Sequence, residues 1–150
     1  MKLAIGADHA GFKLKAQLAN WLRTREGGHH QILDVGTATE ERCDYPDFAA
    51  AVAHAVAHRR VSKGILVCGT GIGMAIAANK IHGIRAGVVW NTEIAGLAAE
   101  HNDVNVLCIP GRFTSLRKAQ EMIHIFLTTP FGGGRHKRRI KKIQALDRCA

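Results

Sequence analysis

The sequence predicts an α/β fold: a three-layer, open, parallel sheet of five strands with helices on both faces, Rossmann-like in its arrangement. Two observations carry this prediction. Short apolar runs alternate with longer amphipathic stretches along the chain. One run, "KGILVC", is apolar almost throughout, as in a parallel strand covered on both faces. At 150 residues, 47% of them hydrophobic, the chain is long enough to bury one core. We therefore expect a single domain over residues 1–150, in which about 132–150 form a basic helical C-terminal arm.

The first half of the chain contains three of the five expected strands. Their runs are "KLAIGAD" (2–8), "QILDVG" (31–36) and "KGILVCG" (63–69). Leu14, Leu18 and Leu22 stand at helical spacing and predict a helix over 10–25. Pro46 suits the first turn of a second helix, because proline lacks the N–H that a first turn leaves unbonded.

The second half continues the alternation. The two remaining strands are "IRAGVVW" (84–90) and "VNVLCIPG" (104–111). The expected helices cover 71–79, a segment from Thr92 toward Glu100, 115–127, and a basic segment after the break "TTPFGGG". Thr92 is the predicted N-cap of its helix. In the basic segment, Ile140, Ile143 and Leu146 form one apolar stripe that needs a surface to cover it.

Composition argues against several classes of protein. The N-terminus lacks the apolar length of a signal peptide, and no apolar run approaches the length of a membrane span. We therefore expect a cytoplasmic protein with no membrane partner. The four cysteines form no CxxC pair and are expected to be reduced thiols; they are Cys43, Cys68, Cys108 and Cys149. No carboxylate or cysteine stands at a companion spacing to His54 and His58, so no metal is expected.

The net charge of +9 is uneven, because the segment "RHKRRIKK" contains six lysines and arginines and no acid. A nucleic-acid arm and a site for an anionic ligand both fit such a segment. Aromatic residues make up only 5% of the chain, without the aromatic interleaving of single-strand binders, so no nucleic-acid partner is expected. Arg135 and Arg139 share one helix face, which suits a phosphate that accepts paired hydrogen bonds.

The loop "CGTGIG" joins the third strand to its helix. Cys68 ends the strand, and Gly69, Gly71 and Gly73 follow. The glycines let backbone N–H groups approach an anion, and the helix N-terminus adds partial positive charge, so both features favour a thiolate. The spacing matches neither a Walker loop nor a dinucleotide fingerprint, and no cofactor is predicted. A buried structural cysteine is the alternative interpretation of this loop.

Two further groups stand near strand ends. Asp8 and His9 follow the first strand, at the edge where open parallel sheets bind ligands. Asp8 could equally cap the helix that comes next. The segment from His101 to Asp103 lies at a helix end before the fifth strand, where a single histidine is usually structural or solvated.

Together these groups describe one kind of chemistry. A thiolate can abstract a carbon-bound proton, and backbone N–H groups can stabilise the oxygen anion that forms beside it. A histidine and an aspartate can move protons between oxygens. With an arginine pair for a phosphate and no cofactor motif, the sequence predicts an aldose–ketose isomerase that acts on a phosphorylated sugar.

The order of six motifs resembles the ribose-5-phosphate isomerase type B family, which also includes allose-6-phosphate and galactose-6-phosphate isomerases. The motifs are "DHAG", "DYPD", "CGTGIGMAIAANK", "GIRAG", "HNDVNVL" and "GGRHKRR". The resemblance runs from Met1 to about Leu146, and the cysteine loop and the "HND" segment are its specific parts. One branch of the family uses a glutamate later in the loop; this chain has no acid there and resembles the cysteine branch.

The resemblance implies roles for particular residues. The implied catalytic positions are Cys68 as the proton-abstracting base, His101 as the proton donor that opens the sugar ring, and Thr70 and Asp8 in proton transfer. The implied substrate-binding positions are Asp8, His9, Gly69, Thr70, Gly71, Ile72, Gly73, Asn102, Arg112, Arg135 and Arg139. Within this set the loop from Gly69 to Gly73 matches the anion hole.

The implied reaction interconverts D-ribose 5-phosphate and D-ribulose 5-phosphate through a cis-enediolate. The same chemistry on allose 6-phosphate is the alternative among enzymes, and a basic phosphate- or nucleic-acid-binding module is the alternative outside them. The family also implies a homodimer, or a tetramer, with active sites shared between subunits and the arm packed on a partner. Two departures stand out: Trp90 could alter the sugar pocket, and Pro110 could shift Arg112.

Overall fold

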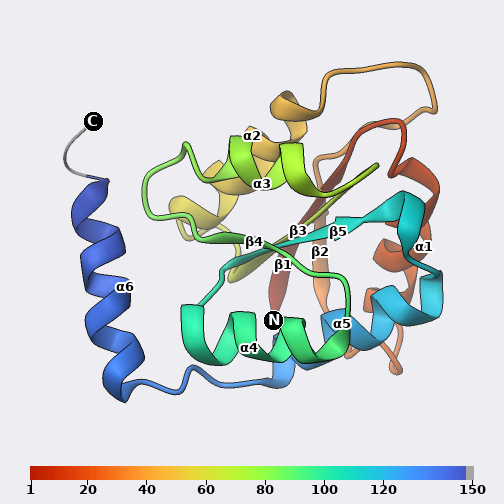
Figure 1. Cartoon of the computed structure of the whole chain (residues 1–150). Helices are drawn as coiled ribbons and strands as arrows, with labels where there is room; N and C mark the ends of the chain where they lie inside the picture. Colours follow the sequence, from red (N-terminus) through yellow and green to blue (C-terminus); the bar gives the residue numbers. More distant parts are fainter. Residues whose placement is uncertain (148–150) are drawn as a thin grey trace.

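The computed structural model describes residues 1–147 and contains the predicted five-stranded parallel sheet (Figure 1). Its strand order is β2-β1-β3-β5-β4, and every pairing is parallel. The strands are β1 (Lys2–Ala7), β2 (Gln31–Asp34), β3 (Lys63–Cys68), β4 (Ala86–Val88) and β5 (Val106–Pro110). The helices of the described residues are α1 (Phe12–Arg23), α2 (Tyr45–Ala57), α3 (Ile72–Ala78), α4 (Thr92–Asn102), α5 (Leu116–Thr128) and α6 (Gly134–Leu146), with a 3-10 helix, η1 (Gly111–Phe113).

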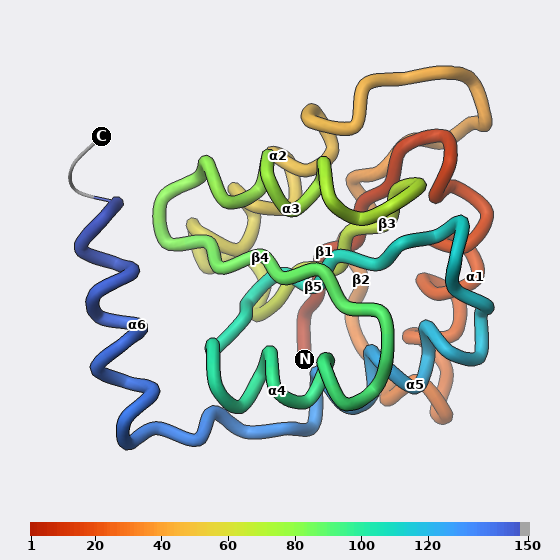
Figure 2. The backbone as a smooth tube through the Cα atoms, viewed as in Figure 1, coloured from red at the N-terminus to blue at the C-terminus, as the bar shows by residue number. Residues whose placement is uncertain are grey.

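Helices cover both faces of the sheet, with α2 and α3 on one face and α1, α4 and α5 on the other (Figures 1 and 2). Side chains alternate along each strand, so Ile65 and Val67 of β3 enter the core under α1, α4 and α5. Leu66 and Cys68 enter the core under α2 and α3. The candidate nucleophile therefore starts from a buried strand end.

The helix starts agree with the sequence at α2 and differ from it at α4. Pro46 lies in the first turn of α2, as predicted. The predicted N-cap, Thr92, was wrong: Asn91 caps α4, and its Oδ1 accepts a hydrogen bond from the Ile94 N–H at 2.8 Å. Asn91 has an extended backbone, whereas Thr92 is already helical, so only the asparagine can reach the third N–H of the helix.

A buried lysine fixes the segment that follows β2. Lys15 of α1 is 3% exposed, and its Nζ lies 2.8 Å from both carboxylate oxygens of Asp34 and 3.0 Å from the carbonyl oxygen of Thr37. The pairing satisfies a charge that would be costly to bury alone. It ties the connection between β2 and α2 to the body of the sheet.

Helix α6 stands beside the sheet edge formed by β4 and is set apart from the layers (Figures 1 and 2). Of its apolar stripe, only Ile140 is buried, whereas Ile143 is 44% and Leu146 70% exposed. At its far end Asp147 accepts a hydrogen bond from the Gly83 N–H at 3.1 Å. Within residues 1–147, no helix has both the length and the apolarity to cross a bilayer.

Candidate functional site

A small cavity lies where β1, β3 and β5 end, at the edge that the sequence predicted. Its volume is about 180 Å³. The residues that line it are Asp8, His9, Ala10, Tyr45, Cys68, Gly69, Thr70, Gly73 and Arg112. Residues far apart in the sequence meet here because parallel strands bring their carboxyl ends to one edge.

Cys68 is the last residue of β3 and is 4% exposed. Its sulfur accepts a hydrogen bond from the Gly71 N–H, with an N···S distance of 3.1 Å. Gly71 has φ 75°, a left-handed conformation that glycine adopts without strain. The turn therefore places a backbone N–H donor against the Cys68 sulfur.

Some backbone N–H groups of the loop after Cys68 donate hydrogen bonds within the loop itself. Besides the Gly71 N–H, the Ile72 N–H donates to the Thr70 Oγ1 at 3.4 Å. Gly71 and Ile72 do not line the cavity, and the Ile72 side chain is 56% exposed. Of the predicted anion-binding loop, Gly69, Thr70 and Gly73 face the cavity, so the row of available donors is shorter than the glycine pattern suggested.

Asp8 and His9 come from the turn after β1. The Asp8 Oδ1 accepts a hydrogen bond from the Gly11 N–H at 3.0 Å, and Gly11 itself is the N-cap of α1. Asp8 thus braces the turn while its side chain lines the cavity. The Nδ1 of His9 lies 3.3 Å from the backbone N of Cys43, which donates to it. A neutral His9 then holds its proton on Nε2 and can donate it to a ligand.

Arg112 and Tyr45 form the walls of the cavity. The Arg112 N–H donates to the Gly69 carbonyl oxygen at 3.2 Å, and its guanidinium lies so close to Gly69 that an added Cβ would be 3.3 Å from Cζ. Pro110 therefore leaves Arg112 at the cavity. The Tyr45 ring covers Gly73, where an added Cβ would stand 2.6 Å from the ring. No role for Tyr45 is predicted from the sequence, although its position just after the segment that follows β2 is a usable signal.

The remaining candidate residues lie at the opposite end of the sheet, where the strands begin. α4 runs antiparallel to the strands, so His101 and Asn102 at its end lie near the start of β5. Gly64 pairs with Val106 at that end, whereas Cys68 pairs with Pro110. The four residue-to-residue steps from one pair to the other span about 13 Å. His101 and Cys68 of one chain are thus too far apart to act on neighbouring atoms.

The turn that holds His101 is fixed by an ion pair. Asp103 has φ 46°, and its carboxylate lies 2.7 Å from the Arg85 guanidinium, which also donates to the Asp103 carbonyl oxygen at 2.7 Å. Arg135 and Arg139 lie near the start of α6, and both are exposed. The structure therefore groups His101, Asn102 and the arginine pair at one end of the molecule, away from the cavity with Cys68.

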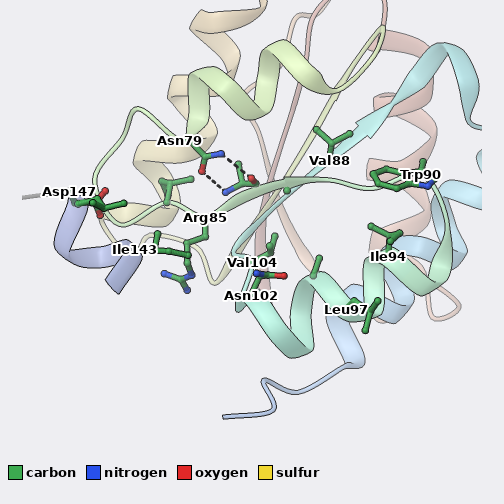
Figure 3. A pocket seen from close by; sticks show the side chains of 15 residues that line it. Asn79, Arg85, Val88, Trp90, Ile94, Leu97, Asn102, Val104, Ile143 and Asp147 are labelled. Carbon is green, nitrogen blue, oxygen red and sulfur yellow. Dashed lines mark hydrogen bonds between the residues drawn. The ribbon is translucent and has the colours of Figure 1, made fainter. Parts of the chain in front are cut away.

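A second, larger hollow of about 580 Å³ lies between α4, β4 and α6 (Figure 3). Trp90, Ile94, Leu97, Ile143 and Leu146 are among its apolar lining residues. Trp90 lines this groove and does not line the cavity with Cys68 of the same chain, so an influence on the sugar pocket stays a prediction. The side chain turns outward along the sheet edge, which the sequence could not indicate.

The other buried thiol differs from Cys68 in its surroundings. Cys108 of β5 is fully buried, and burial, followed by the nearby Cys68, raises the pKa of the Cys108 thiol well above its usual range. Cys108 therefore remains protonated near neutral pH. Cys149 lies outside the described residues.

The fold and the cavity define an α/β enzyme that works at the carboxyl end of a parallel sheet. The profile of the Ribose/Galactose Isomerase family matches residues 3–143, and the chain belongs to this family. It is similar to ribose-5-phosphate isomerase B of Escherichia coli, with 43% identity over 97% of this chain and 96% of that protein. A putative sugar phosphate isomerase of Bacillus subtilis is 41% identical over 95% of both chains.

Solved structures agree with this assignment. Ribose-5-phosphate isomerase B of Clostridium thermocellum superimposes with a TM-score of 0.96, at 42% identity and over 99% of both chains. The enzyme of Mycoplasma genitalium with bound ribulose-5-phosphate gives a TM-score of 0.92 at 37% identity, over 99% of this chain and 97% of that one. The chain is accordingly a sugar-phosphate isomerase, an intramolecular oxidoreductase similar to the type B ribose-5-phosphate isomerases.

Proposed function

We propose that the chain interconverts D-ribose 5-phosphate and D-ribulose 5-phosphate without a cofactor, using Cys68 as the base. The observation that carries this proposal is the buried Cys68 sulfur, which faces a cavity shared with Asp8, His9 and Thr70 and accepts a backbone hydrogen bond. The names of the relatives from E. coli and C. thermocellum support the choice of a five-carbon sugar.

The proposed reaction is a proton transfer between neighbouring carbons. The Cys68 thiolate takes the proton from C2 of the open-chain aldose, and the electron pair left behind forms the C1–C2 double bond of a cis-enediolate. Negative charge on oxygen is stabilised by the N–H groups of Gly69 to Gly73 that face the cavity. Thr70 and Asp8 move a proton from O2 to O1, and the Cys68 thiol returns its proton to C1. No redox partner is consumed.

The remaining roles follow from charge and from the second cluster of residues. His101 donates a proton to the ring oxygen of the cyclic sugar, the bond between that oxygen and C1 breaks, and the C1 hydroxyl loses its proton to water to form the aldehyde. Asn102 contacts the sugar, and His9 donates from Nε2. Arg112, Arg135 and Arg139 hold the phosphate, because paired guanidinium donors match its oxygens.

We infer that the active site is shared between two subunits of a homodimer. The separation of about 13 Å between the strand ends argues that His101, Asn102 and the arginine pair complete the cavity of a partner. The exposed stripe of Ile143 and Leu146 on α6 needs a surface to cover it. A two-fold dimer supplies that surface and lets each arm, residues from about 132 onward, serve the other subunit.

A direct assay tests the proposed function. The purified protein is mixed with ribose 5-phosphate or with allose 6-phosphate, in EDTA, and the absorbance of the ketose product is followed. We expect faster turnover of ribose 5-phosphate, undiminished by EDTA. Faster turnover of allose 6-phosphate would transfer the proposal to the six-carbon sugar. No turnover, together with salt-sensitive binding of nucleic acid, would contradict an isomerase altogether.

A further inference from the structure

Two imidazole rings stack where α4 ends and α6 begins. The ring centroids of His101 and His136 are 4.2 Å apart, and their planes differ by 9°. This separation is shorter than the usual range of about 4.5–7 Å between aromatic centroids. His101 has a role in the proposed reaction, whereas His136, although it lies within the motif "GGRHKRR", has none.

The backbone around the two rings is built to bring them together. The Gly132 N–H donates to the Glu100 carbonyl oxygen at 2.8 Å, directly before His101. A Cβ at Gly132 would lie 3.3 Å from that oxygen and 3.2 Å from the Glu100 Cγ, so glycine leaves room for the close approach. Gly133 and Gly134 have φ 63° and 50°, and they turn the chain back into α6. The stack is therefore held by the chain on both sides of it.

The charges around the stack make the two rings unequal. Burial lowers the pKa of His136 most, and nearby positive charge from His101, Arg135 and Arg139 lowers it further. The Glu100 carboxylate acts in the opposite direction and raises this pKa. Two charged imidazoles at this separation would repel each other. Protonation of His136 is consequently disfavoured where it stacks on His101.

We propose that His136 is a positioning residue that fixes the ring plane of His101 and joins it to the arginine pair of α6. Arg135 precedes His136, and Arg139 follows it by three residues on the same helix. The stack thus makes the ring-opening acid and the phosphate-holding groups one rigid unit, which reaches the cavity of the partner subunit as a whole. This inference rests on the proposed function of His101.

Four variants test the inference in the full-length protein: His101→Asn, His136→Ala, His136→Phe and the double variant His101→Asn/His136→Ala. We expect His136→Ala to lower kcat on ribose 5-phosphate about tenfold with KM changed less than about twofold. The initial rate on ribulose 5-phosphate, which is open-chain before it enolises, should fall less than about threefold. His136→Phe keeps a flat ring and should retain at least about half of the wild-type kcat. The double variant should be no slower than His101→Asn, because His136 acts only through His101.

Other outcomes would overturn the positioning role. A rise in KM for both sugars with unchanged kcat would make His136 a phosphate ligand instead. Additive losses in the double variant, or a His136→Phe as slow as His136→Ala, would mean that the ring acts by its nitrogens and independently of His101. Thermal unfolding and oligomeric state, measured for each variant, control for a general loss of structure.

Different results would contradict the role of His101 as the acid and the role of His136 in positioning it. If the wild type turns over ribose 5-phosphate and His101→Asn is slow, but His136→Ala matches the wild type, only the positioning role is lost. If His101→Asn is as fast as the wild type on ribose 5-phosphate, the proposed acid itself is wrong, and the inference falls with it.

Discussion

The two ends of the sheet present opposite kinds of functional surface. At the carboxyl end, Cys68 and Asp8 are buried, and backbone N–H groups from their own turns hold them in place. At the other end, Arg135 and Arg139 are exposed on a helix that stands apart from the layers (Figure 1). The first region brings buried groups from several strand ends together within one chain, whereas the second presents exposed charged side chains on a single helix.

This difference indicates how the proposed reaction is divided. A base that removes a carbon-bound proton needs a fixed geometry in a water-poor site, which strand ends and tight turns provide. Groups that bind a phosphate need long, charged side chains, which are costly to bury until a ligand or a partner pairs with them. In the proposed reaction, the carbon-bound proton is removed at the strand ends, and the arm contributes two of the three arginines that hold the phosphate.

The largest expected effect tests the chemical end. Cys68→Ala should lower kcat by about a thousandfold or more, because a general base contributes roughly 10² to 10⁴ to the rate. Binding of ribose 5-phosphate should change little, since its affinity comes mainly from the arginines. Steady-state kinetics and equilibrium binding measure the two effects separately. Cys108→Ala is the matched control, a buried thiol on the neighbouring strand that lies outside the cavity; a similar loss of kcat there would make the Cys68 effect structural.

The second prediction tests whether the two ends belong to different subunits. Cys68→Ala and Arg139→Ala proteins, each inactive, are mixed under conditions in which subunits exchange. In a hybrid dimer one site has both defects and the other has neither. Random exchange makes half of the dimers hybrids, so roughly a quarter of the wild-type activity should return.

The control for this experiment is exchange itself, measured by mass spectrometry of the mixed dimers. If hybrids form and no activity returns, the arm serves its own subunit and the shared site is wrong. The isomerase activity proposed for the chain would be untouched by that result.

A third, smaller effect sharpens the description of the cavity. Gly73→Ala adds a Cβ 2.6 Å from the Tyr45 ring and should displace that ring, lowering kcat/KM about tenfold. Alanine favours a helix over glycine by about 1 kcal/mol, so stability should not fall. Removing the ring as well, in Tyr45→Ala/Gly73→Ala, should restore part of the activity if the clash is the cause.

Gly96→Ala is the matched control for that series. Its added Cβ would lie 3.4 Å from Ile125, an ordinary contact on a helix away from the cavity. We expect unchanged kinetics and an equal or higher midpoint of thermal unfolding. Full activity in Gly73→Ala would show that Tyr45 does not shape the cavity.

The smallest expected effect concerns the thiols. Cys68 should be alkylated at least severalfold faster than Cys43, Cys108 or Cys149, and ribose 5-phosphate should protect it. Because burial raises the pKa of Cys108, its thiolate stays scarce as the pH rises from 6 to 9, and its labelling should stay slow over that range. Mass spectrometry of each labelled peptide measures the rates. Equal labelling of Cys68 and Cys108 would remove the distinction between the two buried thiols.

Most of the sheet could be predicted from local pattern, and the exceptions have local causes. The run "KGILVC" reads as a buried parallel strand because both of its faces are apolar, and β3 covers those residues. β4 is shorter than the predicted strand, at three residues, because it is an edge strand with one neighbour to pair with. The choice between Thr92 and Asn91 as the cap depended on backbone angles that either residue type permits.

The cavity at the carboxyl end was likewise accessible from the sequence. Cys68 ends a strand, and Asp8 and Arg112 come just after the ends of two others; a parallel sheet brings all such positions together at the carboxyl ends of its strands. Tyr45 was missed because it belongs to a helix start rather than to a strand end. His136 was missed because its partner, His101, lies 35 positions earlier, and no spacing rule connects two helices that meet only in space.

The sequence by itself determined the fold class and the position of the cavity at the strand ends, because both depend on neighbours along the chain or on a general rule of parallel sheets. The reactivity of the cysteine loop stays a prediction. Only the tertiary structure decided that His101 and the arginine pair stand at the other end of the sheet. Two features fix that placement: α4 runs antiparallel to the strands, and the segment before α6 passes the end of α4, where the Gly132 N–H bonds to the Glu100 carbonyl oxygen. Contacts between distant segments are set by how helices pack on a sheet, and a linear pattern does not record them.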